Sequence, residues 1–210
     1  MIQKRRGKIT AAEHMAQLYS DPEWVRRHEE REAAQKVRVA ERLKEIEPEA
    51  APLVAEMVAA GVKFRPNQIQ QWESGGTIVS SEPIPIRSVW DLVNTKSSYP
   101  EAIPILYKHL RMARHPVVVG GIARALTVKE ACGPQAREIL EKLQRLDFLE
   151  STPAEPRSDA RWCLANALVV VGDASMVEEI KALIADPRYA NVHNRLKDAL
   201  KHCERLARRK

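Results

Sequence analysis

The second half of this chain carries a series of apolar stripes at helical spacing, and these stripes constrain the fold more than any other feature. In the first stripe, Ala102, Ile105, Leu106 and Leu110 recur at separations of three and four residues. Further stripes follow over residues 118–126, 136–146, 160–171, 176–184 and 192–207. A helix with one apolar face must bury that face against another element. The sequence therefore predicts an all-α fold in which three helix pairs share a core.

Prolines stand at the starts of two of these stripes, and a pair of glycines interrupts one of them. Pro100 and Pro116 stand where helices begin, and proline is tolerated there because the first turn leaves its N–H groups unpaired. Gly120 and Gly121 interrupt the second stripe, where each costs roughly 1 kcal/mol relative to alanine in a helix. We expect this glycine pair to permit the close approach of a neighbouring helix. A ligand-binding loop is the alternative, but no strand precedes the glycines as a phosphate-binding loop requires.

The distribution of apolar residues also indicates which helices lie in the middle of the stack and which lie at its ends. The stretch from Ser158 to Val171 is apolar on almost every side, which is typical of a central helix covered by neighbours. The final stretch, Asn191 to about Ala207, is polar on one face, as the last member of a stack must be. Before the first pair, the short helix expected from Ser88 to about Asn94 would cover the open end of the core.

Two segments resemble HEAT repeats. The run from Glu101 to Leu106, followed by Leu110, is similar to the first helix of such a repeat, and Asp159-Ala160-Arg161 with Ala165-Asn166-Ala167-Leu168 is similar to the second. The resemblance implies a short right-handed α-solenoid of about three helix pairs. It also implies a scaffold that binds partner proteins through its curved face, although some members of the family bind nucleic acid. The linker from Asp147 to Arg157 is longer than is typical of the family.

The first 61 residues are expected to form a charged tail and a helical arm. From Arg26 to Glu32 the arm has almost no apolar residue. From Val39 to Ala60 a heptad stripe begins, and it either docks on the end of the repeats or drives self-association. We expect Pro48 and Pro52 to break or kink this helix, and Gly61 to end it.

Residues 62–87 separate the arm from the repeat domain at 88–210. Strands at Gln68 to Trp72 and Thr77 to Ser81, joined by Glu73-Ser74-Gly75-Gly76, predict a small β-hairpin insertion. An isolated hairpin is marginal in water, so Trp72 is expected to anchor it on the helices. The hairpin is either a structural insertion or a contact element for a partner.

Charge is concentrated at the two ends of the chain. Each end carries +4, from Lys4 to Lys8 and from Arg205 to Lys210, so residues 9–204 carry −2 of the net +6. Such tails add weak, nonspecific attraction to nucleic acid, or act as solvated ends that aid solubility. Three widely spaced cysteines favour a reducing compartment, and we expect a cytoplasmic protein with neither a membrane span nor a signal peptide.

The motifs of common enzymes are missing from the sequence. It has no nucleophile elbow, no Walker-type loop and no zinc-binding spacing of histidine and cysteine, so we expect neither a catalytic activity nor a metal or cofactor. One enzymatic alternative remains, because some HEAT-like proteins are DNA glycosylases that use a tryptophan and an aspartate. Asp159 and Trp162 are spaced for that role, but we interpret them as a helix-start residue and a core residue.

The sequence therefore favours non-catalytic binding of a partner protein. The concave face of the second helices is expected to present Arg124, Trp162, Asn166 and Arg195, and Trp72 of the hairpin is expected to add a further contact. Nucleic-acid binding is the alternative function, and self-association through Val39 to Ala60 is a third possibility.

Overall fold

A computed structural model describes residues 10, 15, 18–65, 83–93, 95, 97–147 and 154–209, with the backbone alone over 154–159. The chain divides into two compact units, Met1–Glu45 and Ile46–Lys210. The described part is mostly helical, with one small two-stranded antiparallel sheet, which confirms the all-α prediction. None of its helices is both long and apolar enough to cross a membrane.

Helix α2 (Pro22–Ala59) begins at a side-chain cap. The carboxylate of Asp21 accepts hydrogen bonds from the backbone N–H groups of Glu23 and Trp24, at 2.9 and 3.4 Å. In the first unit most residues of this helix are exposed, including Val39 and Leu43 of the predicted stripe. In the second unit the rest of the stripe joins the core through Ile46, Leu53 and Met57. The docking prediction was therefore correct only for the second part of the stripe.

Of the two effects expected of Pro48 and Pro52, a break or a kink, the break was wrong, because α2 continues through both prolines to Ala59. Both prolines lie four residues apart on the solvent-exposed side of the helix. The backbone carbonyls that lose an N–H partner to proline therefore face water, which can satisfy them. Burial of Leu53 and Met57 on the opposite side stabilises the helix against the missing hydrogen bonds.

Helix α2 ends as predicted at Gly61, whose positive φ of 74° is readily adopted by glycine. The N–H of Gly61 bonds to the carbonyl of Val58 and that of Val62 bonds to Met57, a Schellman motif. Strand β1 (Lys63–Phe64) follows immediately and pairs antiparallel with β2 (Ile84–Pro85), with Phe64 opposite Ile84. The predicted hairpin strands and Trp72 lie outside the described residues.

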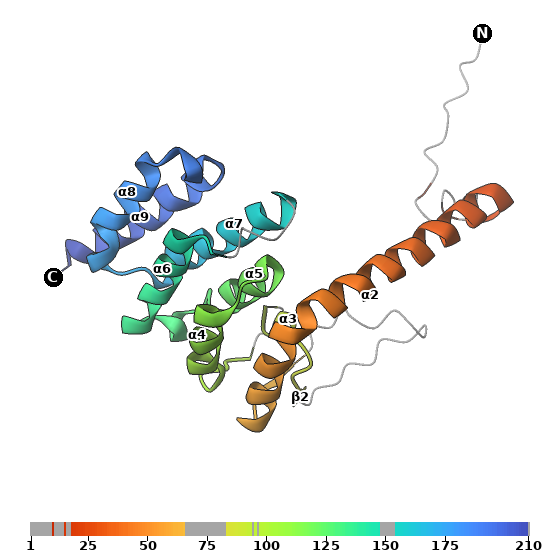
Figure 1. Ribbon diagram of the computed structural model, residues 1–210, viewed down its shortest axis with the longest axis horizontal. Helices are drawn as coiled ribbons and strands as arrows, with labels where there is room; N and C mark the ends of the chain where they lie inside the picture. Colours follow the sequence, from red (N-terminus) through yellow and green to blue (C-terminus); the bar gives the residue numbers. More distant parts are fainter. Residues whose placement is uncertain are drawn as a thin grey trace, which may run out of the picture. The chain divides into compact units, whose positions relative to one another are not determined.

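Three helix pairs make up most of the second unit, after the short helix α3 (Val89–Val93). The pairs are α4 (Ala102–Met112) with α5 (Pro116–Ala125), α6 (Arg137–Arg145) with α7 (Ala154–Val171), and α8 (Val177–Ala185) with α9 (His193–Ala207). Short 3-10 turns at Lys129–Ala131, Pro134–Ala136, Ala174–Met176 and Pro187–Val192 connect or precede them. Figure 1 shows the pairs following one another from the green to the blue part of the chain.

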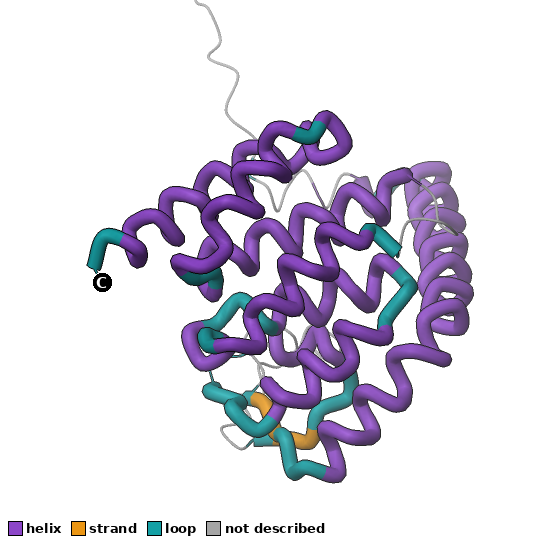
Figure 2. Tube along the Cα trace, turned by 60° about the vertical axis from the view of Figure 1, so that its left-hand side comes forward, coloured by secondary structure: helices purple, strands orange, loops and turns teal. Residues whose placement is uncertain are grey.

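The second helices of successive pairs lie side by side, and so do the first helices of the first two pairs. Helix α3 packs on α5, α5 on α7, and α7 on α9, while α4 packs on α6. The tube in Figure 2 shows this succession of helices, with the two short strands paired among loops. The largest fully buried side chains include Tyr107, Leu110 and Ile122, all from the predicted stripes or next to them.

Gly121 confirms the expected close approach of a neighbouring helix, which is α3. A Cβ atom at Gly121 would lie 2.8 Å from Cγ1 of Val89 and 3.2 Å from the Trp90 ring, so no larger residue fits without displacement. Helix α7 differs from the prediction in beginning at Ala154 rather than Ser158. Asp159 therefore lies inside this helix, and its interpretation as a helix-start residue was wrong.

Candidate functional site

Four of the five predicted contact residues lie on the second helices of the three pairs. Arg124 is on α5, Trp162 and Asn166 are on α7, and Arg195 is on α9. Since α5 packs on α7 and α7 on α9, these residues come from three neighbouring helices.

Trp162 and Arg195 form a direct contact between α7 and α9. The guanidinium carbon of Arg195 lies 5.1 Å from the centre of the Trp162 ring, within the range of a cation–π interaction. Trp162 is 36% exposed, so its interpretation as a core residue was wrong. Helix α7 presents this ring on the side away from Ala160 and Leu164, which are fully buried.

Arg124 makes the equivalent contact between α5 and α3. Its guanidinium carbon lies 5.4 Å from the centre of the Trp90 ring. Its Nε–H also donates to the sulfur of Cys163 on α7, at 3.1 Å. Arg124 therefore links three helices, and this limits how far its side chain can move.

Trp90 also belongs to this surface, although the short helix that contains it was predicted only to cover the open end of the core. We call the surface the second-helix face and define it as Trp90, Arg124, Trp162, Asn166 and Arg195. The contacts already given run across α3, α5, α7 and α9 in turn. Asn166 is half-buried one helical turn after Trp162, so its amide adds a donor and an acceptor beside the ring.

A small pocket of about 260 Å³ lies beside Arg124. Tyr99 and Glu130 are among its lining residues, and each is already engaged within the protein. The Tyr99 hydroxyl donates to the carbonyl of Ala125 at 2.8 Å, and burial raises the pKa of Tyr99 to about 12. Hydrogen bonds from its own backbone N–H and from Ser98 lower the pKa of Glu130. Neither group is therefore suited to exchange protons near neutral pH.

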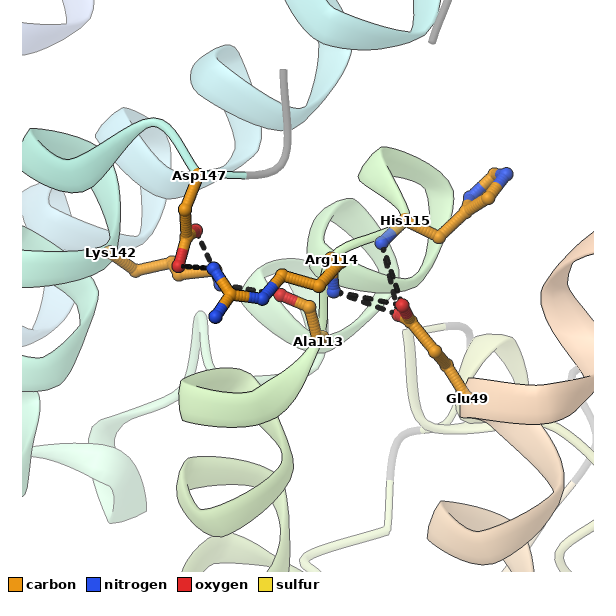
Figure 3. A network of polar contacts seen from close by, with 6 residues as sticks. All are labelled: Glu49, Ala113, Arg114, His115, Lys142 and Asp147. Atoms are coloured by element: carbon orange, nitrogen blue, oxygen red, sulfur yellow. Dashed lines mark hydrogen bonds and ion pairs between the residues drawn. The ribbon is translucent and has the colours of Figure 1, made fainter. Parts of the chain in front are cut away.

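A network of polar contacts around the turn between α4 and α5 stabilises the fold. Figure 3 shows Glu49 of α2 pointing at the turn between α4 and α5, where its carboxylate accepts from the backbone N–H groups of Arg114 and His115 at 3.0–3.1 Å. The Arg114 side chain reaches Asp147 on the other side of the turn. The turn is thus held from both α2 and the end of α6.

Lys142 contributes to the same network from within the core. Its side chain is fully buried, donates to the carbonyl of Ala113 and lies 2.7 Å from the carboxylate of Asp147. Burial lowers the pKa of Lys142, and its contact with Asp147 opposes that shift. These partners satisfy the charge of Lys142 and make it a structural joint between α4 and α6.

The three cysteines form no disulfide with one another in the described residues. Burial raises the pKa of Cys203 to about 11. Within the described ranges, no three side chains of histidine, cysteine, aspartate or glutamate gather as a metal site requires.

Comparison with known proteins does not assign the chain to a family. No protein-family model, curated protein or solved structure matches the chain.

Proposed function

We propose that this protein is a non-catalytic binding module whose three helix pairs form a short solenoid of the HEAT-like kind. Two observations support the solenoid: successive second helices pack on one another, and so do α4 and α6. Since a solenoid buries its core between repeats, it leaves one layer of helices to form an extended surface.

The second-helix face binds the partner protein in this proposal. The observation that carries the proposal is the cation–π contact of Arg195 with the partly exposed ring of Trp162. Tryptophan and arginine are the side chains most enriched among residues that dominate binding energy. This contact also restricts both side chains before the partner arrives, which lowers the entropy lost on binding.

A capture experiment tests this function. The full chain, immobilised, is incubated with lysate of its native cells at low and high salt, with and without nuclease. We expect a discrete protein to be retained in every condition and to be lost when Trp162→Ala replaces the wild type. Lys181→Ala, on the exposed surface of α8, is the matched control and should retain the partner.

Two results would contradict the proposal. Retention by Trp162→Ala equal to that of the wild type would show that the second-helix face is not the binding surface. Material that disappears with nuclease would instead support the alternative, a nucleic-acid-binding protein. Circular dichroism of each variant establishes that the substitution has left the helices intact.

A further inference from the structure

We propose that the part of α2 in the first unit associates with the same segment of a second copy of this chain, as an antiparallel two-stranded coiled coil over residues 25–43. This inference is independent of the proposed function, because it concerns a different helix and a different surface. Three observations support it: the spacing of one stripe, the exposure of its apolar members and the order of the charges along the helix.

The stripe that joins α2 to the core continues into the first unit at the same spacing. In the second unit its members Ile46, Leu53 and Met57 are buried. A stripe that alternates separations of four and three residues is the sequence requirement of a coiled coil. Towards the start of the helix this alternation continues through a set of residues that we call the seam, namely Leu43, Val39, Lys36, Glu32, Glu29 and Val25.

The apolar residues near the end of the seam lack the burial that the same stripe has in the second unit. Val39 is 49% exposed and Leu43 is 57% exposed. Ion pairs along this part of the helix, such as Arg26 with Glu30 at 2.9 Å, contribute little at exposed positions. Most helical stability in proteins comes instead from the packing of an apolar face. A second copy that covers Val39 and Leu43 supplies that packing.

The charges of α2 are ordered in two blocks of opposite sign. Three of the four residues 29–32 are acidic, whereas residues 36–44 contain four basic residues and one acidic residue. In a parallel pair, blocks of the same sign would face each other, which is unfavourable. In an antiparallel pair, the acidic block of each copy faces the basic block of the other. The charge order therefore favours the antiparallel arrangement, in which the helix is complementary to itself.

The seam also indicates the register of the two helices. When two seams run in opposite directions with their ends aligned, Val25 faces Leu43 of the second copy. Glu32 then faces Lys36 of the second copy, and each of these contacts occurs twice because the pair is symmetric. Polar residues at seam positions specify register and orientation in coiled coils, at some cost in stability.

The two acidic residues of the seam are compatible with this register. Glu29 faces Val39 of the second copy, and its long side chain can lie across the valine while its carboxylate remains in water. Glu32 lies 3.4 Å from Nε2 of His28, and its side chain is 56% exposed. That distance exceeds that of a charge-assisted hydrogen bond, so the contact is weak and leaves Glu32 accessible to Lys36 of the second copy.

Sedimentation equilibrium of the full chain, from about 1 μM to about 1 mM, measures the association. We expect monomer and dimer without larger species, because each seam in the pair covers the other. Leu43→Ser should weaken the dimer about tenfold, since it removes an apolar contact from both ends of the pair. Val37→Ser is the matched control, because Val37 is also 57% exposed but lies outside the seam. It should change the dissociation constant less than about twofold.

Reversal of the central charges tests the orientation and the register. Glu32→Lys places a lysine opposite Lys36 in both central contacts and should weaken the dimer about tenfold. Lys36→Glu should weaken it by a similar factor, because two carboxylates then meet. An equimolar mixture of the two variants should form mixed dimers within about threefold of the wild-type affinity, because every central contact then joins opposite charges.

A parallel pair gives a different pattern of results. Like charges then face each other in the wild type, so neither single reversal would weaken the dimer, and the mixture would associate more tightly than the wild type. That pattern overturns the antiparallel assignment. A chain that stays monomeric up to about 1 mM, or equal losses for Leu43→Ser and Val37→Ser, overturns association through the seam altogether.

Two further measurements keep these results interpretable. Circular dichroism of each variant establishes that the helices are intact, so that a lost dimer is not a lost fold. Trp162→Ala should leave the dimer unchanged, because that residue lies on the second-helix face. A dimer that survives Trp162→Ala while the captured protein is lost separates this inference from the proposed function.

Discussion

The two layers of helices in the second unit join their neighbours by different contacts. On the first-helix side, comprising α4, α6 and α8, carboxylates bridge adjacent helices: Glu138 lies 3.6 Å from Arg111, and Glu179 lies 2.6 Å from Arg137. On the second-helix face, arginines lie on tryptophan rings instead.

This difference has a consequence for the surface that each layer presents. An ion pair neutralises both of its charges, so the first-helix side cancels much of its own field. A cation on an aromatic ring keeps its full charge. The first-helix side is therefore suited to holding the repeats together, whereas on the second-helix face the Arg195 cation contacts both the Trp162 ring and the carboxylate of Asp198.

The largest expected effect concerns Lys142, the buried cation of the first-helix side. Lys142→Ala should lower the free energy of unfolding by about 3 kcal/mol, because it removes one partner of a buried ion pair. It also leaves the carbonyl of Ala113 without its donor. Urea denaturation measures this change, and Lys181→Ala, an exposed cation, should cost less than about 0.5 kcal/mol. Equal costs would contradict the assignment of Lys142 as a joint.

Gly121→Ala tests the packing beneath the second-helix face. Overpacking costs about 1–3 kcal/mol, and the higher helix propensity of alanine returns about 1 kcal/mol, so we expect a net loss. The new Cβ would displace Val89 or the Trp90 ring on which Arg124 lies. Val89→Ala removes the nearest methyl group, so the cost of Gly121→Ala should fall in that background. A double-mutant cycle by thermal denaturation measures this coupling, and strictly additive effects would contradict the close approach.

Arg137→Gln and Arg195→Gln compare the two kinds of contact directly. The first breaks a partly exposed ion pair between α6 and α8 and should cost about 0.5 kcal/mol. The second removes a cation from the Trp162 ring and should cost a similar amount, about 0.5 kcal/mol. Urea unfolding measured at low and at high salt distinguishes the ion pair of Arg137 from the cation–π contact of Arg195. Salt should diminish the effect of Arg137→Gln more, because screening weakens exposed ion pairs and leaves the packing of a guanidinium on a ring.

The smallest expected effect is a dependence on pH at Glu56 of α2. Hydrogen bonds from Lys108 and then His109, at 2.8–3.0 Å, lower the pKa of Glu56 below its ordinary value of 4.5. A carboxyl group whose pKa is lower in the folded state stabilises the fold above its unfolded pKa and loses that contribution as the pH falls. The difference in Tm between wild type and Glu56→Gln should therefore be present at pH 6 and shrink as the pH falls below 4.5. A difference that grows with acidity would contradict the assigned ion pair.

Much of the fold could be predicted because the apolar stripes determine it locally. The stripes of Ala102 to Leu110 and of Val118 to Leu126 correspond to α4 and α5. In contrast, the possible break at Pro48 and Pro52 did not occur, since local propensity does not indicate which side of a helix faces water. The core interpretation of Trp162 failed for a related reason. Periodicity marks the two sides of an apolar helix, but it does not reveal which of them a neighbour covers.

For the candidate site, the sequence by itself determined the residue types and their positions on second helices, because helical spacing fixes which side chains share a stripe. Only the tertiary structure decided that Arg124 meets Trp90 and that Arg195 meets Trp162. Those partners lie more than thirty residues apart in the chain, between Trp90 and Arg124 and between Trp162 and Arg195. Their contact depends on the packing of α3 on α5 and of α7 on α9, which no local pattern specifies.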